Sequence, residues 1–308
     1  MSHSAFIPRS LMIGAIFGAL AVPGVAQDAD LDTLRSRALE LVNADRDEQG
    51  LPALSRGETL DRSAQAHAED MLRRDFYAHT GPDGNGPRDR FLTAGGSEWE
   101  LVAENIARCR GCGDLSRERI EAFQEGWMNS PEHRANILRE GLTRFGFGAA
   151  AGEDEIFAVQ TFAGPGMSRG KSSEPAGEGA ITDLAVAAIN AARDDNGVAP
   201  LEPNAALTEG ARSLVPEDLG SFTLEGMDGL RSALPAEGPR WRAVQAVAAA
   251  CGGCGARITE GDVEGFVSDW LAGSRAAQLL REEMTDAGMV VRMNGAGRKV
   301  ALLLLGAR

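Results

Sequence analysis

The sequence predicts an α+β protein made of two similar domains in tandem. Helical patterns precede strand patterns in each half, which favours helices layered on a small sheet. The length of 308 residues suits two domains of ordinary size. The halves also resemble each other at two offsets, 142 and 147. The matching segments are Trp99 to Gly113 with Trp241 to Gly255, Gly164 with Gly306, and Asn43 to Gly50 with Asn190 to Gly197.

The first 26 residues have the pattern of a secretory signal peptide. Arg9 supplies the charged start, Leu11 to Val22 the apolar run, and Gly24 to Ala26 the small-residue cleavage site. An apolar run of about a dozen residues is short for a membrane span, which needs roughly 20. We therefore expect a secreted or periplasmic protein, cleaved near Ala26, that is not an integral membrane protein. An uncleaved anchor is the alternative.

The chain is acidic, with 31 basic and 45 acidic residues and a net charge of −14. A charge of this sign disfavours binding to phosphate backbones and to anionic lipid headgroups. The sequence therefore predicts no nucleic-acid partner. An unknown protein, a lipid or a small molecule remain as partners, although aromatic residues make up only 5% of the chain and no apolar loop indicates a lipid site.

Four helices are predicted in the first half, because apolar residues recur there every three or four positions. They run over residues 32–49, 58–74 and 116–128, and a fourth begins at Ser130 and Pro131. His67 lies on the apolar stripe of the second helix, so we interpret it as a core or cleft-wall histidine. Residues 80–87 are too rich in Gly and Pro for anything but a loop.

Two strands are predicted to close the first half, at residues 145–149 and 156–162. Apolar residues occupy both faces of the second strand, which suits a sheet covered on both sides. Residues 165–179 have little apolar content and are typical of a flexible linker. The second domain is predicted for residues 180–308, ending in an apolar strand over 300–305.

The four cysteines form two pairs with the same spacing, Cys109 with Cys112 and Cys251 with Cys254. In an exported protein the simplest interpretation is one short disulfide in each domain. A thioredoxin-like redox pair would need its first cysteine at a helix N-terminus, whereas the neighbouring glycines indicate a loop. A shared four-cysteine zinc site is a further alternative.

Motifs of the first half resemble, in order, those of the bacterial branch of the CAP superfamily, also called the SCP or PR-1 family. They are Ala78-His79-Thr80, Ala103 to Ala107, Trp127 to Leu138 and Phe145 to Gly148. The resemblance covers residues 31–164 and implies secretion and an α-β-α sandwich with a central cleft, here the domain at 27–164. Through the internal repeat, residues 180–308 are interpreted as a degenerate CAP-like domain.

The resemblance also implies a cleft tetrad of two histidines and two glutamates that binds zinc in some members. By position, His79 and His133 correspond to the histidines and Glu104 to the first glutamate. The position of the second glutamate holds a serine in this chain. The fourth cleft residue is therefore left open among Ser130, Glu132 and Glu125.

The chemistry of these residues agrees with a site. Two imidazoles and one carboxylate are a recognised ligand set for zinc, the only cofactor that the sequence suggests. His133 would lie in the first turn of its helix, where the positive helix end favours a neutral ring. Glu104 lies among apolar neighbours and needs a partner. The repeat replaces Glu104 with Ala246, and the position of His79 falls near Leu224 or Glu225.

Three functions follow from this pattern. The first is a secreted binding or interaction module whose cleft holds a small ligand or a divalent metal. The second is a periplasmic zinc-dependent hydrolase with water as the nucleophile. The third is a purely structural envelope protein. No cysteine is free and no serine lies in a Gly-x-Ser-x-Gly signature, so the sequence favours binding over turnover and assigns no catalytic residue.

Overall fold

The computed structural model describes residues 23–223, 229–236 and 239–308, with side chains from residue 30 onward. Most of the predicted signal peptide, and Leu224 and Glu225, lie outside the described residues. Within these ranges no helix is long and apolar enough to cross a membrane.

Each half contains one four-stranded sheet, and the two sheets have the same strand order. The first half consists of α1 (Pro23–Asp47), β1 (Ser55–Arg56), α2 (Glu58–Arg74), α3 (Pro87–Thr93), β2 (Leu101–Arg110), α4 (Arg117–Met128), α5 (Pro131–Ile137), β3 (Arg144–Ala151) and β4 (Glu155–Gly164). Its sheet has the order β1-β3-β4-β2, with β1 parallel to β3 and the other pairs antiparallel.

The second half repeats this plan, with shorter counterparts of α1, α2 and α5. It consists of η1 (Glu178–Ala180), α6 (Ile181–Asp195), β5 (Glu202–Pro203), α7 (Ala205–Leu214), η2 (Leu219–Ser221), β6 (Ala243–Cys251), α8 (Glu260–Ala272), α9 (Ala276–Leu279), β7 (Asp286–Met293) and β8 (Lys299–Ala307). Its sheet has the order β5-β7-β8-β6. The predicted fold class, tandem α-β-α sandwiches in an α+β protein, is confirmed.

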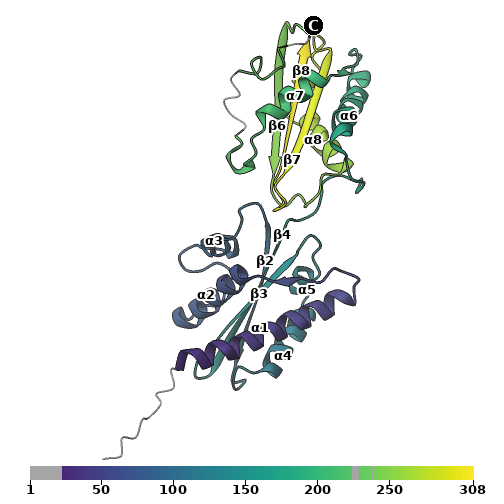
Figure 1. Ribbon diagram of the computed structural model, residues 1–308. Coiled ribbons are helices and arrows are strands. Elements are labelled where there is room, and N and C mark those ends of the chain that lie inside the picture. The colour runs from purple at the N-terminus through teal and green to yellow at the C-terminus, as the bar shows by residue number, and fades with distance from the viewer. Residues whose placement is uncertain (1–22, 224–228, 237–238) are drawn as a thin grey trace, which may run out of the picture.

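Helices cover both faces of each sheet (Figure 1). In the first half, α2 and α3 lie on one face, and α1, α4 and α5 lie on the other. In the second half, α7 covers one face, and α6 and α8 cover the other. Alternate residues of β8 divide between these layers: Leu303 and Leu305 pack with α6 and α8, whereas Leu302 and Leu304 pack with α7.

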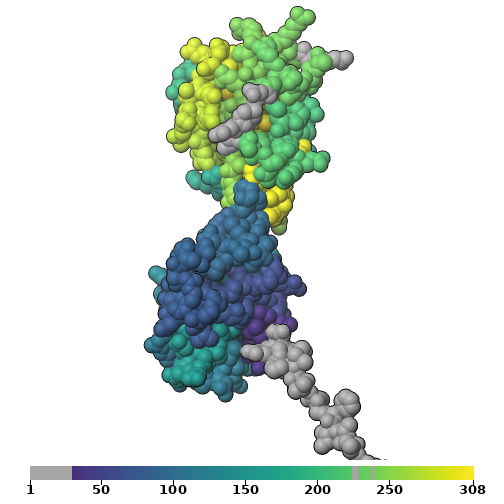
Figure 2. All heavy atoms as spheres, turned by 90° about the vertical axis from the view of Figure 1, so that its left-hand side faces the viewer, coloured from purple at the N-terminus to yellow at the C-terminus, as the bar shows by residue number. Residues whose placement is uncertain are grey.

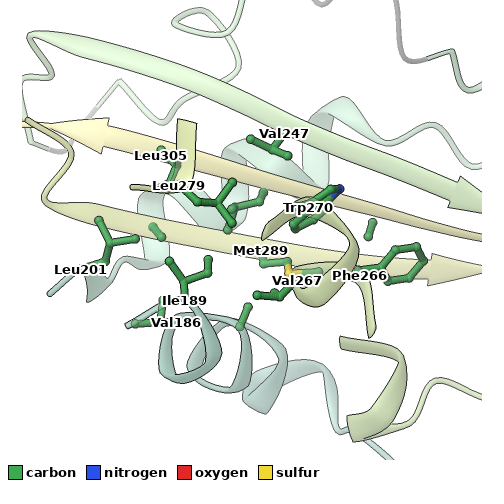
Figure 3. Close-up of a cluster of buried hydrophobic side chains, with 14 of the residues drawn as sticks. Val186, Ile189, Leu201, Val247, Phe266, Val267, Trp270, Leu279, Met289 and Leu305 are labelled. Atoms are coloured by element: carbon green, nitrogen blue, oxygen red, sulfur yellow. The ribbon is translucent and has the colours of Figure 1, made fainter. Parts of the chain in front are cut away.

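The core of the second half lies between its sheet and the pair α6 and α8 (Figure 3). Phe266 and Trp270 of α8 stack with ring centroids 6.3 Å apart. Phe123 and Trp127 occupy the matching places on α4, at 5.9 Å. Burying aromatic side chains of this size contributes several kcal/mol in each half, so the second half keeps the packing of the first.

Two polar side chains, a half-buried asparagine and a buried arginine, make the same hydrogen bonds in both halves. Asn43 binds both backbone polar groups of Leu54, and Asn190 does the same at Leu201. The matching arginines are Arg46 and Arg193. Each binds the loop that follows its own helix and the turn at the end of α5 or α9. Arg46 donates to the carbonyls of Pro52, Ile137 and Arg139, and Arg193 donates to those of Ala199, Leu279 and Arg281. These residues of the sequence match are therefore part of the fold.

Most predicted helices and strands are present, with changes at their ends. The helix α2 has the predicted bounds, and α4 and α5 begin where expected, after Ser116 and Ser130. The helix α1 begins at Pro23 rather than near Asp32, because proline is well suited to the first turn of a helix. The predicted cleavage point near Ala26 falls in that first turn.

Three elements of the first half were not predicted, and one of them is the two-residue strand β1. The helix α3 has only seven residues and follows the Gly/Pro-rich loop directly. The strand β2 is missing from the prediction because Glu104 and Asn105 are adjacent polar residues on opposite faces, which hides the alternation of a strand. Its counterpart β6 was missed as well.

The predicted cysteine pairs are confirmed. Cys109 lies in β2 and Cys251 ends β6, and the Cα atoms of the two disulfides are 6.0 and 6.2 Å apart. Each disulfide therefore joins the end of a strand to the loop that follows it. The expectation that all four cysteines lie in loops is corrected in this respect.

Strand pairing also corrects one detail of the sequence match. Leu101 pairs with Gly164, and its counterpart Ala243 pairs with Ala307 rather than with Gly306. The offset between β4 and β8 is thus 143, one residue more than the offset between β2 and β6.

The two halves are separate lobes with a narrow contact between them (Figure 2). The segment predicted as a linker, residues 165–179, hydrogen-bonds to the second half: the carbonyl of Pro165 accepts from Gly255, and the amide of Arg169 donates to Asp262. In the contact itself, the amide of Gly253 donates to the carbonyl of Trp99 at 2.7 Å. The guanidinium of Arg298 lies 3.6 Å from the centroid of the Trp99 ring.

Candidate functional site

The candidate site follows the free edge of β2, the outermost strand of the first sheet. Side chains satisfy the outward carbonyls of this edge. The amide of Asn136 donates to the carbonyl of Glu104 at 3.1 Å. The indole of Trp127 and the hydroxyl of Tyr77 both donate to the carbonyl of Ile106, at 3.0 and 3.1 Å. Two motif residues, Trp127 and Asn136, thus protect a sheet edge, which is a structural task.

The carboxylate of Glu104 is the centre of the site, and its side chain is only 1% exposed. Its Oε1 atom lies 2.9 Å from Nδ1 of His79, and its Oε2 atom accepts from Arg90 at 2.8 Å. Nε2 of His67 lies 3.9 Å from Oε1. The partner that the sequence analysis required for Glu104 is therefore a histidine together with an arginine that the sequence did not indicate.

Arg90 of α3 connects the site to the preceding loop. It donates to the carbonyls of Asn85 and His79, each at 2.8 Å, in addition to Glu104. Charge-assisted hydrogen bonds of this kind are the strong ones. Arg90 thereby holds both the carboxylate of Glu104 and the loop that carries His79.

The hydrogen bond to Glu104 determines which face of the His79 ring is free for binding. An ionised carboxylate only accepts hydrogen bonds, so Nδ1 of His79 carries the proton and Nε2 keeps its lone pair. The His79 side chain is 49% exposed. The site therefore presents an imidazole lone pair to solvent and orients it from behind with a buried carboxylate.

His67 has a different role from His79. It is fully buried on α2, and its Nε2 lies 3.0 Å from the carbonyl of Ala78, to which it donates. Burial lowers the pKa of His67, and the charge of Arg90 acts in the same direction, whereas Glu104 raises it. His67 is thus a cleft-wall histidine that holds the His79 loop, as the sequence indicated.

The pKa of His67 leads to a prediction about stability. Its folded value lies below the unfolded value near 6.5, so the unfolded chain binds more protons as the pH falls below about 6.5, and the folded state loses stability. We expect a lower melting temperature at about pH 5.5 than at about pH 7.5. His67→Gln, which can still donate to Ala78, should reduce this difference. An unchanged difference in the variant would show that another group is responsible.

His133 lies in the first turn of α5, as predicted, and is half-buried. Its carbonyl accepts from the amide of Asn105 at 3.1 Å. Burial lowers the pKa of His133, the neighbouring His79 lowers it further, and Glu132 raises it. A neutral ring at neutral pH follows, with its lone pair available.

The three candidates for the fourth cleft residue do not join this group. Glu125 and Glu132 are exposed, and Ser130 occupies the N-cap position of α5 without a hydrogen bond from its side chain. Among the hydrogen bonds of the described residues, none links one of them to His79, Glu104 or His133. The charged side chain that does contact Glu104 is the cationic Arg90.

The donor set does not fit a metal ion as it is arranged. In the described ranges, no group of three or more His, Cys, Asp and Glu side chains is placed to hold one. Both oxygens of Glu104 are engaged, and the guanidinium of Arg90 at 2.8 Å opposes a divalent cation beside it. Zinc binding by His79, Glu104 and His133 stays a prediction that this arrangement does not favour.

A chain of buried amides extends from the site through the sheet, and the sequence analysis did not identify it. Asn136 donates to Asn105, Asn105 to Gln160, Gln160 to Gln124 and Gln124 to Asp45, over 3.0, 3.1, 2.7 and 2.5 Å. Such networks rigidify a core when every member is satisfied. The chain ties α5 and the cleft edge of β2 to α4 and α1.

The second half replaces this chain by apolar residues. Sheet pairing places Val247 at the position of Asn105 and Leu303 at that of Gln160, and Val247 and Leu303 pair with each other as the amides do. The sequence could have indicated the amide chain through this comparison, because polar residues of the first half are apolar in the second.

The first half is thus an α-β-α sandwich with a cleft of imidazole and carboxylate groups along one sheet edge. Residues 39–162 match the model of the CAP family, described as the cysteine-rich secretory protein family. This match confirms that the first half resembles the CAP superfamily, in its bacterial branch.

Two proteins of Bacillus subtilis (strain 168) are similar to this chain. The uncharacterized protein YkwD is 32% identical over 120 residues, 39% of this chain and 44% of that protein. The uncharacterized membrane protein YlbC is 30% identical over 130 residues, 42% of this chain and 34% of that protein. The chain therefore spans less than half the length of both relatives.

Among solved structures, an extracellular protein containing a SCP domain from Bacillus anthracis str. Ames is 26% identical, with a TM-score of 0.37. The similarity covers 47% of this chain and 44% of that one.

Proposed function

We propose that this protein is a secreted binding module whose first half takes a small ligand on His79 and His133. The observation that carries the proposal is the hydrogen bond between the buried Glu104 and the half-exposed His79. A carboxylate bonded to Nδ1 leaves Nε2 as an oriented acceptor in a half-exposed ring. A ligand group that donates a hydrogen bond, such as a hydroxyl, matches this acceptor.

The second half supports a binding role over a purely structural one. It keeps the sheet order, the buried arginine and the aromatic core of the first half. It has Ala246 in place of Glu104 and no histidine anywhere. Because the same architecture is stable without these groups, the fold does not require them. We infer that the halves derive from one repeated unit and that the second serves as a packing partner.

Zinc is a second candidate ligand of the same cleft, since imidazoles are among the usual zinc ligands. Binding would require Glu104 to exchange Arg90 for the metal. A zinc-dependent hydrolase would require in addition a third protein ligand and an open position for water. The small-ligand form of the proposal needs neither change.

A fragment screen tests the proposed function. Ligand-observed NMR with hydroxyl-bearing fragments is run on the wild type, His79→Ala and His133→Ala, and zinc is titrated into the same three proteins. We expect fragments that bind the wild type and lose at least tenfold in affinity in His79→Ala, since a tenfold change corresponds to about 1.4 kcal/mol. Fragments held equally by all three proteins would contradict the proposal. Equal zinc uptake by all three would remove the metal form.

Export is part of the same proposal. The amino-terminal pattern supports it, and cleavage near Ala26 would leave the cleft intact, since the described cleft residues all lie beyond residue 60. Amino-terminal sequencing of the protein from the culture medium or periplasm tests this point. Recovery of the chain only with cells and with residues 1–26 attached would contradict it.

A further inference from the structure

We propose that the groove between α2 and α3 is a second binding site, which takes a small carboxylate ligand. It is a cavity of about 400 Å³ behind the cleft, lined by Arg62, Ser63 and Ala66 of α2 and by Arg90 and Thr93 of α3. A volume of this size is in the range of small-molecule sites. The site shares Arg90 with the cleft but none of its histidines, so it does not depend on the proposed function.

Two buried polar atoms of the cavity lining have no hydrogen-bond partner. They are the hydroxyl of Ser63, a residue only 2% exposed, and Nε of Arg90. Both terminal nitrogens of Arg90 are engaged, by Asn85 on one side and by His79 and Glu104 on the other. Buried polar groups are normally hydrogen-bonded. Two unpaired groups in one cavity lining indicate a ligand that accepts from both.

The charges around the cavity select an anion. Arg62, which is exposed and held by a 2.8 Å hydrogen bond to the carbonyl of Ala94, and the half-buried Arg90 both line the cavity. No Asp or Glu is among the described residues that line the cavity. A carboxylate offers two acceptor oxygens and no donor, which matches one N–H and one O–H. The methyl groups of Ala66, Thr93 and Ala94 provide an apolar wall for a short hydrocarbon part.

Among its described residues, the second half has no open cavity at the position that corresponds to this groove. Gly146 packs against Leu60 of α2 and Gly288 against Leu207 of α7, so these helices correspond at an offset of 147. Gly210 therefore stands at the position of Ser63, and Glu209 at that of Arg62. A Cβ atom on Gly210 would lie 2.6 Å from the side chain of Leu234, which fills the space. The described part of the second half therefore lacks the hydroxyl donor, the arginine and the cavity, and it also lacks the cleft residues.

Benzoate is the probe for this site, compared with its neutral analogue benzamide and with inorganic phosphate. Binding to the full-length mature protein is followed by two-dimensional NMR and calorimetry. We expect saturable benzoate binding with shifts at Ser63, Ala66 and Thr93, and benzamide weaker by at least tenfold. Ser63→Ala should weaken benzoate binding about tenfold, as expected for a hydrogen bond to a charged group. Since the Ser63 hydroxyl has no partner, this variant should keep its melting temperature.

Matched variants separate this site from the cleft. Ala66→Leu fills the groove and should abolish benzoate binding, whereas Glu69→Gln on the same helix, outside the cavity, should not alter it. His79→Ala should leave benzoate binding unchanged even where it abolishes ligand binding in the cleft. The proposal is overturned if benzoate fails to bind, if benzamide binds equally, if Ser63→Ala has no effect, or if phosphate binds in place of benzoate.

Discussion

Replacing Arg193 by methionine is expected to lower the free energy of unfolding by about 3 kcal/mol or more. Arg193 is fully buried and donates to four backbone carbonyls, those of Ala199, Leu279, Arg281 and Met284. Methionine fills similar space but leaves these acceptors without a partner, and each buried unsatisfied group costs about 1–3 kcal/mol. Relief of the burial cost of the guanidinium, which also lowers the pKa of Arg193, offsets part of the loss.

The matching variant in the first half, Arg46→Met, should have an effect of similar size, since Arg46 makes three of the equivalent bonds. Urea unfolding followed by circular dichroism measures both. Arg212→Met is the control, because Arg212 is 34% exposed and pairs with surface glutamates, and such pairs contribute about 0–1 kcal/mol. A loss below 1 kcal/mol in Arg46→Met and Arg193→Met would contradict the assignment of these arginines to the fold.

Replacing Arg90 by methionine is expected to destabilise the first half by about 3–5 kcal/mol, the usual cost of leaving one partner of a buried ion pair. The Glu104 carboxylate is 1% exposed and would keep only His79 as a partner. Arg90→Met also removes the bonds that hold the carbonyls of Asn85 and His79. We therefore expect the His79 loop to become protease-sensitive as stability falls.

A double variant tests the cause of this loss. If an uncompensated charge is responsible, adding Glu104→Gln to Arg90→Met should recover part of the lost stability. Arg73→Met serves as the surface control, since its side chain is 67% exposed. Additive losses in the double variant would contradict the charge argument and would assign the effect of Arg90 to packing alone.

Local patterns explain how much of the fold could be predicted from the sequence. The helix α2 has a regular apolar stripe and acidic residues in its first turn, so its bounds follow from short-range signals. The strand β4 has apolar residues on both of its faces, because helices cover both faces of the sheet. The strand β2 has no such signal. Its two adjacent polar residues serve different layers, Glu104 toward α2 and α3 and Asn105 toward α4.

The candidate site was predictable in part, for a similar reason. The motifs and the repeat indicated His79, Glu104 and His133. Arg90 could not be found in this way, because it lies in a stretch with no periodic pattern and reaches Glu104 only through the placement of α3 beside β2. Its guanidinium lies beside Glu104, where it opposes a divalent cation. The amides Asn105 and Gln160 did leave a trace, as apolar residues at the matching positions.

Glu104 is expected to orient His79 so that Nε2 is a free acceptor. Imidazole nitrogen NMR of the ¹⁵N-labelled protein at about pH 7.5 tests it most directly, because the two ring nitrogens distinguish the tautomers. We expect a proton on Nδ1 of His79 and an unprotonated Nε2, with the preference lost in Glu104→Gln. A proton on Nε2 in the wild type, or the same spectrum in Glu104→Gln, would contradict it.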